Sequence, residues 1–122
     1  MNKSVLVVDD NPQHRYLLAY LLRHANYHVE TAINGQDAVQ KASAMTPDLI
    51  LMDLQLPGTD GYEATRILKS TPALARIPVV AVTAHAMAGD KEKALDVGCV
   101  GYIEKPFAPE SIADEIALYF NI

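Results

Sequence analysis

The chain has almost no cysteine, no excess of basic residues and no long apolar run, and each absence excludes a class of protein. Its single cysteine, Cys99, rules out an internal disulfide and fits a reducing compartment. The 10 Lys and Arg residues are outnumbered by 15 Asp and Glu residues, so no basic patch for nucleic acid is expected. The apolar run from Val5 to Val8 meets Asp9 and Asp10 at once, and is too short for a signal peptide or a membrane span. We therefore expect a cytoplasmic protein that binds neither nucleic acid nor membranes.

What the chain does contain is enough for one ordinary hydrophobic core. Half of its 122 residues are hydrophobic, so the core needs no metal or disulfide to support it. A chain of this length has the size of one domain. No linker, internal repeat or low-complexity stretch divides it, and we expect residues 1–122 to form a single domain.

Five short apolar runs recur at roughly even spacing along the chain. The first, third and fourth are nearly continuous in apolar residues, which is typical of strands buried on both faces of a parallel sheet. The second and fifth are shorter and more mixed, as edge strands tend to be. The runs cover residues 5–8, 27–32, 49–52, 77–82 and 100–103.

Segments with helical spacing lie between and after these runs. The weakest covers residues 86–97, carries Lys91, Glu92 and Lys93 in its middle, and is closed by Gly98. Strand and helix alternating five times predict a doubly wound α/β fold with helices on both faces of the sheet. The apolar faces of the other segments are Leu17, Leu18, Leu21, Leu22 and Ala25 after Pro12; Ala38, Ala42 and Met45; Ala64, Ile67 and Leu68; and Ile112, Ile116 and Phe120 after Pro109.

Polar residues follow four of the five runs, at the point where each expected strand ends. They are Asp9 and Asp10, Asp53, Thr83 and Lys105. Ligands collect at the carboxyl ends of the strands in an open parallel sheet, so these side chains should converge on one edge. Three carboxylates and one lysine sum to about −2, an arrangement that is repulsive unless a cation is present. Such oxygen ligands suit Mg²⁺ together with a phosphoryl group, which an aspartate can accept as a covalent nucleophile.

Each of these residues, taken alone, also has a purely structural interpretation. A carboxylate just after a strand, such as Asp9 or Asp10, is commonly a helix N-cap or a turn residue. Thr83 alone would be a strand-end residue, and Lys105 alone a solvated loop lysine. Their joint placement at successive strand ends is what favours a functional site.

The chain resembles the receiver domain of two-component response regulators over essentially its full length. The resemblance rests on four segments in order, VLVVDDN, LILMDLQLPGTDGYE, PVVAVTA and GYIEKPF. It implies a five-stranded parallel sheet in the flavodoxin-like order 2-1-3-4-5, with helices on both faces. It also implies a signalling switch, which takes a phosphoryl group from a histidine kinase or a histidine phosphotransfer protein and then changes its binding to a downstream protein target. Beyond its own phosphorylation and dephosphorylation, no enzymatic activity is implied.

The resemblance implies a phosphoacceptor and the residues that hold its metal. Asp53 corresponds to the phosphoacceptor. Asp9 and Asp10 correspond to the acidic pair that holds Mg²⁺ beside Asp53, with Asp10 as the more direct ligand. The backbone carbonyl of Gln55 would be a further ligand, so its side chain is not required for the metal.

The resemblance also implies how the phosphoryl group is held and how the signal leaves the site. Thr83 and Lys105 would contact the phosphoryl oxygens. Tyr102 corresponds to the aromatic switch residue, which turns inward when Thr83 moves. A cis Lys105–Pro106 peptide bond is expected, because a trans bond would swing the lysine away from the acceptor. The output surface would comprise the helix after Thr83, the strand carrying Tyr102 and the helix from Pro109.

Smaller features of the sequence fit the same resemblance. Pro57 and the Asp60-Gly61 pair match the loop that shapes the floor of the site and begins the next helix. Gln55 and His85 occupy two variable positions that tune the lifetime of the phosphorylated form. The remaining histidines, at positions 14, 24 and 28, show no metal-ligand spacing.

Competing interpretations fail on specific residues. A haloacid-dehalogenase-like phosphohydrolase needs a second aspartate two residues after its nucleophile, where Gln55 stands. A flavodoxin-like or nucleotide-binding module needs a glycine-rich loop after the first strand, where this chain has Asp9-Asp10-Asn11-Pro12. A structural interaction domain leaves the acidic edge unexplained. Between a stand-alone regulator and a receiver excised from a larger hybrid kinase, Met1 favours the first.

Overall fold

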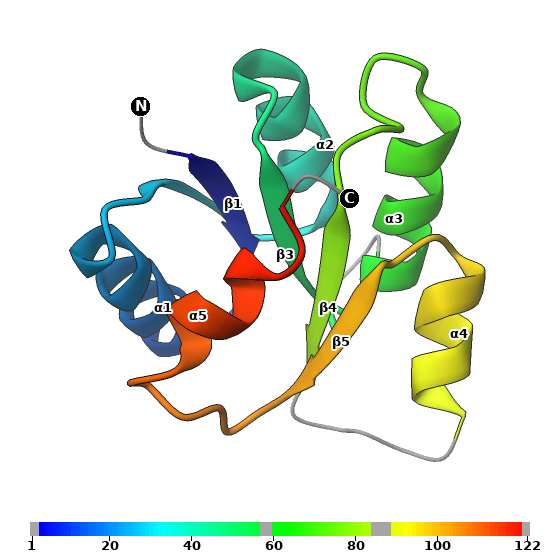
Figure 1. Ribbon diagram of the computed structural model, residues 1–122. Coiled ribbons are helices and arrows are strands. Elements are labelled where there is room, and N and C mark those ends of the chain that lie inside the picture. The colour runs from blue at the N-terminus through cyan, green and yellow to red at the C-terminus, as the bar shows by residue number, and fades with distance from the viewer. Residues whose placement is uncertain (1–2, 57–59, 84–88, 121–122) are drawn as a thin grey trace.

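A five-stranded parallel sheet forms the centre of the computed structural model, which describes residues 3–56, 60–83 and 89–120 (Figure 1). Its strand order is β2-β1-β3-β4-β5, as the resemblance implied. All four strand pairs are parallel, so the carboxyl ends of the strands lie at one edge of the sheet. The strands are β1 (Ser4–Val8), β2 (His28–Ala32), β3 (Leu49–Asp53), β4 (Val79–Thr83) and β5 (Gly101–Glu104).

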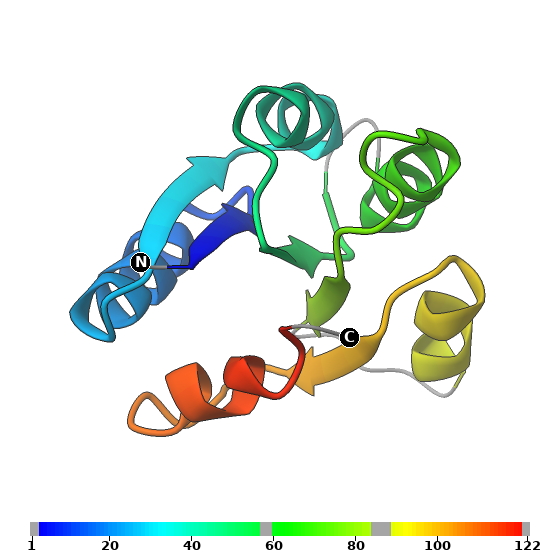
Figure 2. The same ribbon diagram turned by 45° about the horizontal axis from the view of Figure 1, so that its top comes forward.

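Helices cover both faces of the sheet (Figure 2). Helices α1 and α5 pack on one face through a core that includes Leu18, Leu22 and Ile116. Helices α2, α3 and α4 pack on the other face, where Ala38 and Ala64 are buried. The helices are α1 (Pro12–His24), α2 (Gly35–Met45), α3 (Gly61–Ser70), α4 (Asp90–Asp96) and α5 (Ile112–Ala117). The doubly wound α/β fold expected from the sequence is confirmed.

Burial along the strands follows the composition of the apolar runs. Strands β3 and β4 are buried throughout, and β1 is buried from Val5 onwards. The edge strands β2 and β5 mix buried, half-buried and exposed positions. A central strand is covered by helices on both faces, which is why its sequence is nearly continuous in apolar residues.

The N-termini of the first three helices are capped by polar side chains. Asn11 caps α1 by accepting hydrogen bonds from the backbone N–H groups of Gln13 and His14. Asn34 caps α2 and Asp60 caps α3 in the same way. Since Asn11 is the cap of α1, Asp9 and Asp10 are not N-caps, but Asp9 does act as a turn residue, because its Oδ1 accepts a hydrogen bond of 2.9 Å from the Asn11 N–H.

Three expected helical features differ from the structure. The buried stripe of α1 is Leu18, Ala19 and Leu22, while Leu17 is 44% exposed, because successive helical positions point about 100° apart. Ile67 is 36% exposed for the same reason. Helix α5 begins at Ile112, three residues after Pro109. The expected start of the fourth helix, at residues 86–88, lies outside the described residues.

Candidate functional site

Parallel pairing brings the polar strand ends to one edge of the sheet. Asp53 ends β3 and lies in register with Val82 of β4, one residue before Thr83. Thr83 pairs in turn with Glu104 of β5, and its backbone carbonyl accepts a hydrogen bond of 2.8 Å from the backbone N–H of Lys105. The expected convergence of these residues therefore follows directly from the sheet.

Asp9, Asp10 and Asp53 form an acidic cluster at this edge. Each offers one carboxylate oxygen, and the three oxygens lie within 4.8 Å of one another. Asp9 and Asp53 are buried, whereas Asp10 is exposed. Carboxylate oxygens at this spacing, with one of them open to solvent, are a donor set that fits a hard divalent cation such as Mg²⁺.

The Asp53 carboxyl is buried among charged and hydrogen-bonding groups whose effects on its pKa oppose one another. Burial raises its pKa above the usual range, and the nearby Asp9 carboxylate raises it further. Two contacts act in the opposite direction. The backbone N–H of Gln55 donates a hydrogen bond of 2.9 Å to Asp53 Oδ1, and the Lys105 ammonium lies beside Oδ2.

Lys105 lies between the carboxylates with its side chain 10% exposed. Its Nζ is 2.6 Å from Asp9 Oδ2 and 3.5 Å from Asp53 Oδ2. The expected lysine therefore reaches the acceptor, although its shorter contact is with Asp9. The Lys105–Pro106 peptide bond is cis, which confirms that expectation.

Gly61 begins α3 directly against the backbone of the acceptor strand. Its N–H donates a hydrogen bond of 3.2 Å to the Leu54 carbonyl. A Cβ atom at position 61 would stand 2.2 Å from the Asp53 carbonyl oxygen, so only glycine fits. The expected role of Asp60-Gly61 in beginning this helix is confirmed. Pro57 and His85 both lie outside the described residues.

The two expected switch residues occupy adjoining strands. Thr83 is buried at the end of β4. Tyr102 is half-buried on β5 and packs against the core on the α2–α3–α4 side. Its hydroxyl is shielded from solvent and has no hydrogen-bond partner among the described residues.

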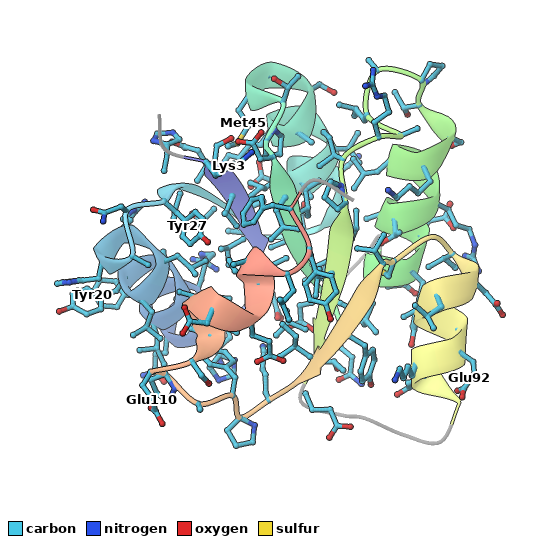
Figure 3. All side chains as sticks on the ribbon, in the orientation of Figure 1. Lys3, Tyr20, Tyr27, Met45, Glu92 and Glu110 are labelled. Carbon is cyan, nitrogen blue, oxygen red and sulfur yellow. The ribbon has the colours of Figure 1, made fainter. Side chains whose placement is uncertain are left out.

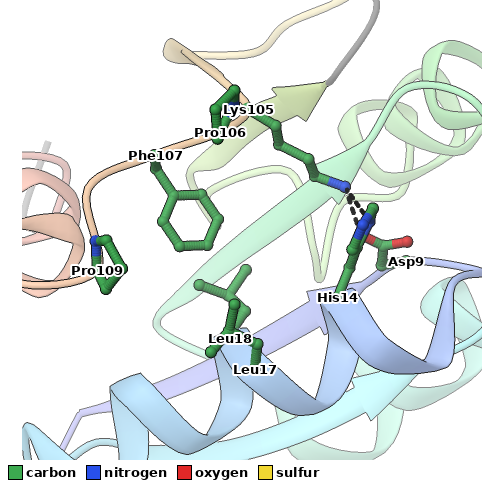
Figure 4. Close-up of a pocket in the computed structure, with 8 residues that line it drawn as sticks. All are labelled: Asp9, His14, Leu17, Leu18, Lys105, Pro106, Phe107 and Pro109. Atoms are coloured by element: carbon green, nitrogen blue, oxygen red, sulfur yellow. Dashed lines mark hydrogen bonds and ion pairs between the residues drawn. The ribbon is translucent and has the colours of Figure 1, made fainter.

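His14 is a residue of the site that the sequence reasoning missed. Its Nδ1 lies 3.3 Å from Lys105 Nζ and 3.9 Å from Asp9 Oδ2 (Figure 4). Metal-ligand spacing was the wrong criterion for this histidine. The available signal was its position in the first turn of the helix that Pro12 begins, directly after the acidic pair.

A cavity of about 420 Å³ adjoins the acidic cluster. Leu17 and Leu18 line it from α1, and Phe107 lines it from the segment after β5 (Figure 4). Asp9, His14 and Lys105 close the end nearest the site. This cavity accounts for the exposure of Leu17, which faces it instead of the core.

Comparison with known proteins identifies relatives of the same size and relatives that are far longer. The family model of the response regulator receiver domain matches residues 5–117. The polar-differentiation response regulator DivK of Brucella anthropi is 42% identical over 121 residues, which cover 99% of this chain and 98% of that protein. The signal transduction histidine-protein kinase BarA of Escherichia coli is 43% identical over 116 residues, 95% of this chain but only 13% of the kinase.

A solved structure with a metal ion shares the fold. It is the receiver domain of a sensor histidine kinase from Pseudomonas aeruginosa, with magnesium coordinated in its active-site cleft. The two chains are 34% identical, the alignment covers 98% of each, and the TM-score is 0.89.

Proposed function

We propose, from the premise that this chain belongs to the response regulator receiver domain family, that Asp53 is the side chain that carries the phosphoryl group. The chain is a phosphoacceptor signalling switch, as this family is. The observation that carries the assignment is the cluster of three carboxylates within 4.8 Å, into which the Lys105 ammonium projects.

Asp53 fits the acceptor role better than its two acidic neighbours. It stands at the end of the central strand β3, and its Oδ1 is fixed by the Gln55 N–H. Its Oδ2 has the longer of the two lysine contacts, at 3.5 Å. Asp9 is held more tightly, because Oδ1 accepts from the Asn11 N–H and Oδ2 from Lys105. Asp10 is exposed and opens the cluster to solvent.

Receiver domains bind Mg²⁺ at an acidic site, and we propose that Asp9, Asp10, Asp53 and the backbone carbonyl of Gln55 hold the ion here. The donor set supports this proposal, since oxygen ligands with an excess of negative charge suit a hard cation. When bound, Mg²⁺ neutralises the cluster and the charge of an incoming phosphoryl group.

The proposed reaction transfers one phosphoryl group to this chain's own side chain. An Asp53 oxygen forms a bond to phosphorus while the bond from phosphorus to the donor breaks, and the donor leaves with that electron pair. Lys105 and Thr83 donate hydrogen bonds to the phosphoryl oxygens. Hydrolysis of the acyl phosphate returns the carboxylate. We propose no other substrate.

We propose that Thr83 and Tyr102 carry the signal away from the site. The Tyr102 hydroxyl is shielded and has no hydrogen-bond partner in the described part of the chain, an arrangement that costs about 1–3 kcal/mol and favours a second rotamer. A shift of Thr83 towards the phosphoryl group changes the space beside the tyrosine and selects between its rotamers. The output surface then comprises α4, β5 and α5, which bind a downstream protein.

We propose a histidine kinase or a histidine phosphotransfer protein as the phosphodonor, in the cytoplasm. The relatives include a whole response regulator and receiver segments of two kinases, so the chain fits either a stand-alone regulator or a receiver within a longer protein. We propose residues 1–122 as one receiver domain in both cases. No helix in the described ranges is long and apolar enough to span a bilayer.

The test of this function is labelling by acetyl phosphate, followed by intact mass. The wild-type protein should gain one phosphoryl group in Mg²⁺ and none in EDTA. The Asp53→Asn variant should stay unlabelled while its circular dichroism spectrum matches that of the wild type. Full labelling in EDTA, or stable labelling of the variant, would contradict the assignment.

A further inference from the structure

His14 places an imidazole nitrogen beside the Lys105 ammonium, outside the acidic cluster. Its Nδ1 is 3.3 Å from Lys105 Nζ, and Figure 4 shows the imidazole rising from α1 beside the lysine and Asp9. A lysine ammonium has donors only, so this contact requires Nδ1 to be the unprotonated nitrogen of the ring. The imidazole is half-exposed, so it lies between the Lys105 ammonium and solvent.

The position of His14 is fixed by its backbone. Its N–H donates to the Asn11 side chain at 3.1 Å, in the first turn of α1. The next residue, Arg15, donates from its guanidinium to the Asp9 carbonyl at 2.9 Å and ties the same turn to the end of β1. The imidazole is therefore presented to Lys105 by an anchored helix end.

The three donors of the ammonium match three acceptors in the structure. They are Asp9 Oδ2 at 2.6 Å, His14 Nδ1 at 3.3 Å and Asp53 Oδ2 at 3.5 Å. Two of these acceptors are the carboxylates to which a cation and a phosphoryl group would come. An imidazole nitrogen competes poorly for a hard cation, so the His14 contact persists when the carboxylates are engaged elsewhere.

We propose that His14 is a positioning residue, which holds Lys105 at the acidic edge and thereby sets the rate at which Asp53 is phosphorylated. This inference rests on the proposed function of Asp53. His14 acts only through Lys105. It accepts a hydrogen bond from the ammonium and carries no phosphoryl group itself.

The test compares two substitutions of similar shape at His14, of which only one has a hydrogen-bond acceptor. The Oδ1 atom of His14→Asn stands as many bonds from the backbone as the histidine Nδ1, so this variant keeps an acceptor. His14→Leu branches at the same carbon but has no acceptor. The matched control is His24→Leu, an exposed histidine on the same helix that contacts Tyr20 and lies away from the site.

The first measurement is the rate of labelling by acetyl phosphate at saturating Mg²⁺. His14→Leu should be slowed about threefold to tenfold, the equivalent of one hydrogen bond of modest net strength, while His14→Asn stays within about twofold of the wild type. His24→Leu should match the wild type. If His14→Leu labels at the wild-type rate, or if the Leu and Asn variants are slowed equally, the positioning role is wrong. Failure of the wild type to label would instead contradict the proposed function.

The second measurement needs neither Mg²⁺ nor phosphorylation. The ¹⁵N–¹H signal of the Lys105 ammonium, recorded at low temperature in the metal-free protein, reports whether its protons are held by acceptors. We expect this signal in the wild type and in His14→Asn, and a signal weakened by faster proton exchange in His14→Leu, which keeps only the two carboxylate contacts. An unchanged signal in His14→Leu would overturn the inference even if the labelling rate falls.

Discussion

Gly61 shows how one small residue can set the geometry of a site to which it contributes no functional group. Replacing a helical glycine with alanine normally stabilises the folded protein by about 1 kcal/mol, because alanine has the higher helix propensity. Here the added Cβ would stand 2.2 Å from the Asp53 carbonyl oxygen and 2.6 Å from Leu54 Cα, both of them backbone atoms that cannot rotate away. We therefore expect Gly61→Ala to destabilise the protein by about 1–3 kcal/mol, the usual cost of overpacking.

The same substitution should also displace Asp53 from its partners. Urea unfolding would measure the stability, and acetyl phosphate labelling would measure the acceptor. Arg66→Ala is the control on the same helix, because Arg66 is exposed and makes only a surface ion pair with Glu63. A Gly61→Ala variant as stable and as readily labelled as the control would contradict this account.

The acidic edge could be predicted from sequence because parallel strands bring their carboxyl ends together. Asp9, Asp53 and Lys105 lie at the carboxyl ends of three different strands, and the parallel sheet brings these ends together. His14 could not be found in the same way. Its position depends on the residue at which Asn11 caps α1 and on the direction in which one imidazole points. The alternation of strands and helices in the sequence predicts neither.

At the scale of elements, α4 is the helix least tied to the rest of the fold. Ala94 is its only buried residue, and none of the described side chains caps its N-terminus. Tyr62 of α3 holds it from the side, through a hydroxyl contact of 3.4 Å to Asp90 and a ring that lies 4.3 Å from Lys93 Nζ. Burial and the Asp90 carboxylate raise the pKa of Tyr62 to about 12, so the hydroxyl keeps its proton and donates at neutral pH.

We expect Tyr62 variants to loosen α4 without unfolding the domain. Tyr62→Phe removes the hydroxyl contact and should speed amide hydrogen exchange in α4 about twofold to tenfold, as expected for one hydrogen bond. Tyr62→Leu also removes the cation–π contact and should speed it further. Exchange in α1 should not change. Equal protection of α4 in all three proteins would show that α4 is held by other contacts.

Prediction from sequence was more accurate for the strands than for the helix faces. All five apolar runs lie within about two residues of the observed strand ends, and burial on both faces explains the nearly continuous apolar residues of β1, β3 and β4. Helix faces were less accurate. Leu17 has the spacing of a core residue, but it lines the cavity beside the site. Sequence spacing identifies an apolar face without saying whether the sheet or a cavity lies opposite.

At the scale of the whole molecule, the acidic cluster should couple metal binding to stability. In EDTA the three carboxylates repel one another, so Asp10→Asn should be more stable than the wild type. Mg²⁺ at ten times its dissociation constant should stabilise the wild type by about 1.4 kcal/mol and the variant by much less. Thermal unfolding with and without Mg²⁺ measures both effects. Glu110→Gln removes an exposed charge (labelled in Figure 3) that is not part of the cluster, and should leave the Mg²⁺ effect unchanged. An equal Mg²⁺ effect in Asp10→Asn would exclude Asp10 as a ligand.

The final expectation concerns the surface through which the molecule signals. Phosphorylation adds close to two negative charges at the edge that Thr83 shares with Asp53. The loosely held α4 lies on the β5 side of that edge, together with the Tyr102 hydroxyl, which has no partner within residues 3–56, 60–83 and 89–120. Helix α1, in contrast, is anchored by Asn11 and by three buried side chains. A ligand shifts a pre-existing equilibrium only by its differential affinity for the two states, so the element with the fewest contacts should move most.

Amide NMR spectra with and without beryllofluoride, a phosphoryl mimic, test this asymmetry. Beyond the acidic edge itself, we expect the largest shifts in α4, in β5 around Tyr102 and in α5, and small shifts along α1 from Leu18 to His24. Asp53→Asn should show none of these shifts, because the mimic has no carboxylate to bind. Tyr62→Phe should show part of the α4 shift before beryllofluoride is added, because it removes a contact that holds the resting position. Shifts concentrated in α1, with α4 and β5 unchanged, would place the output surface around α1 and contradict this account.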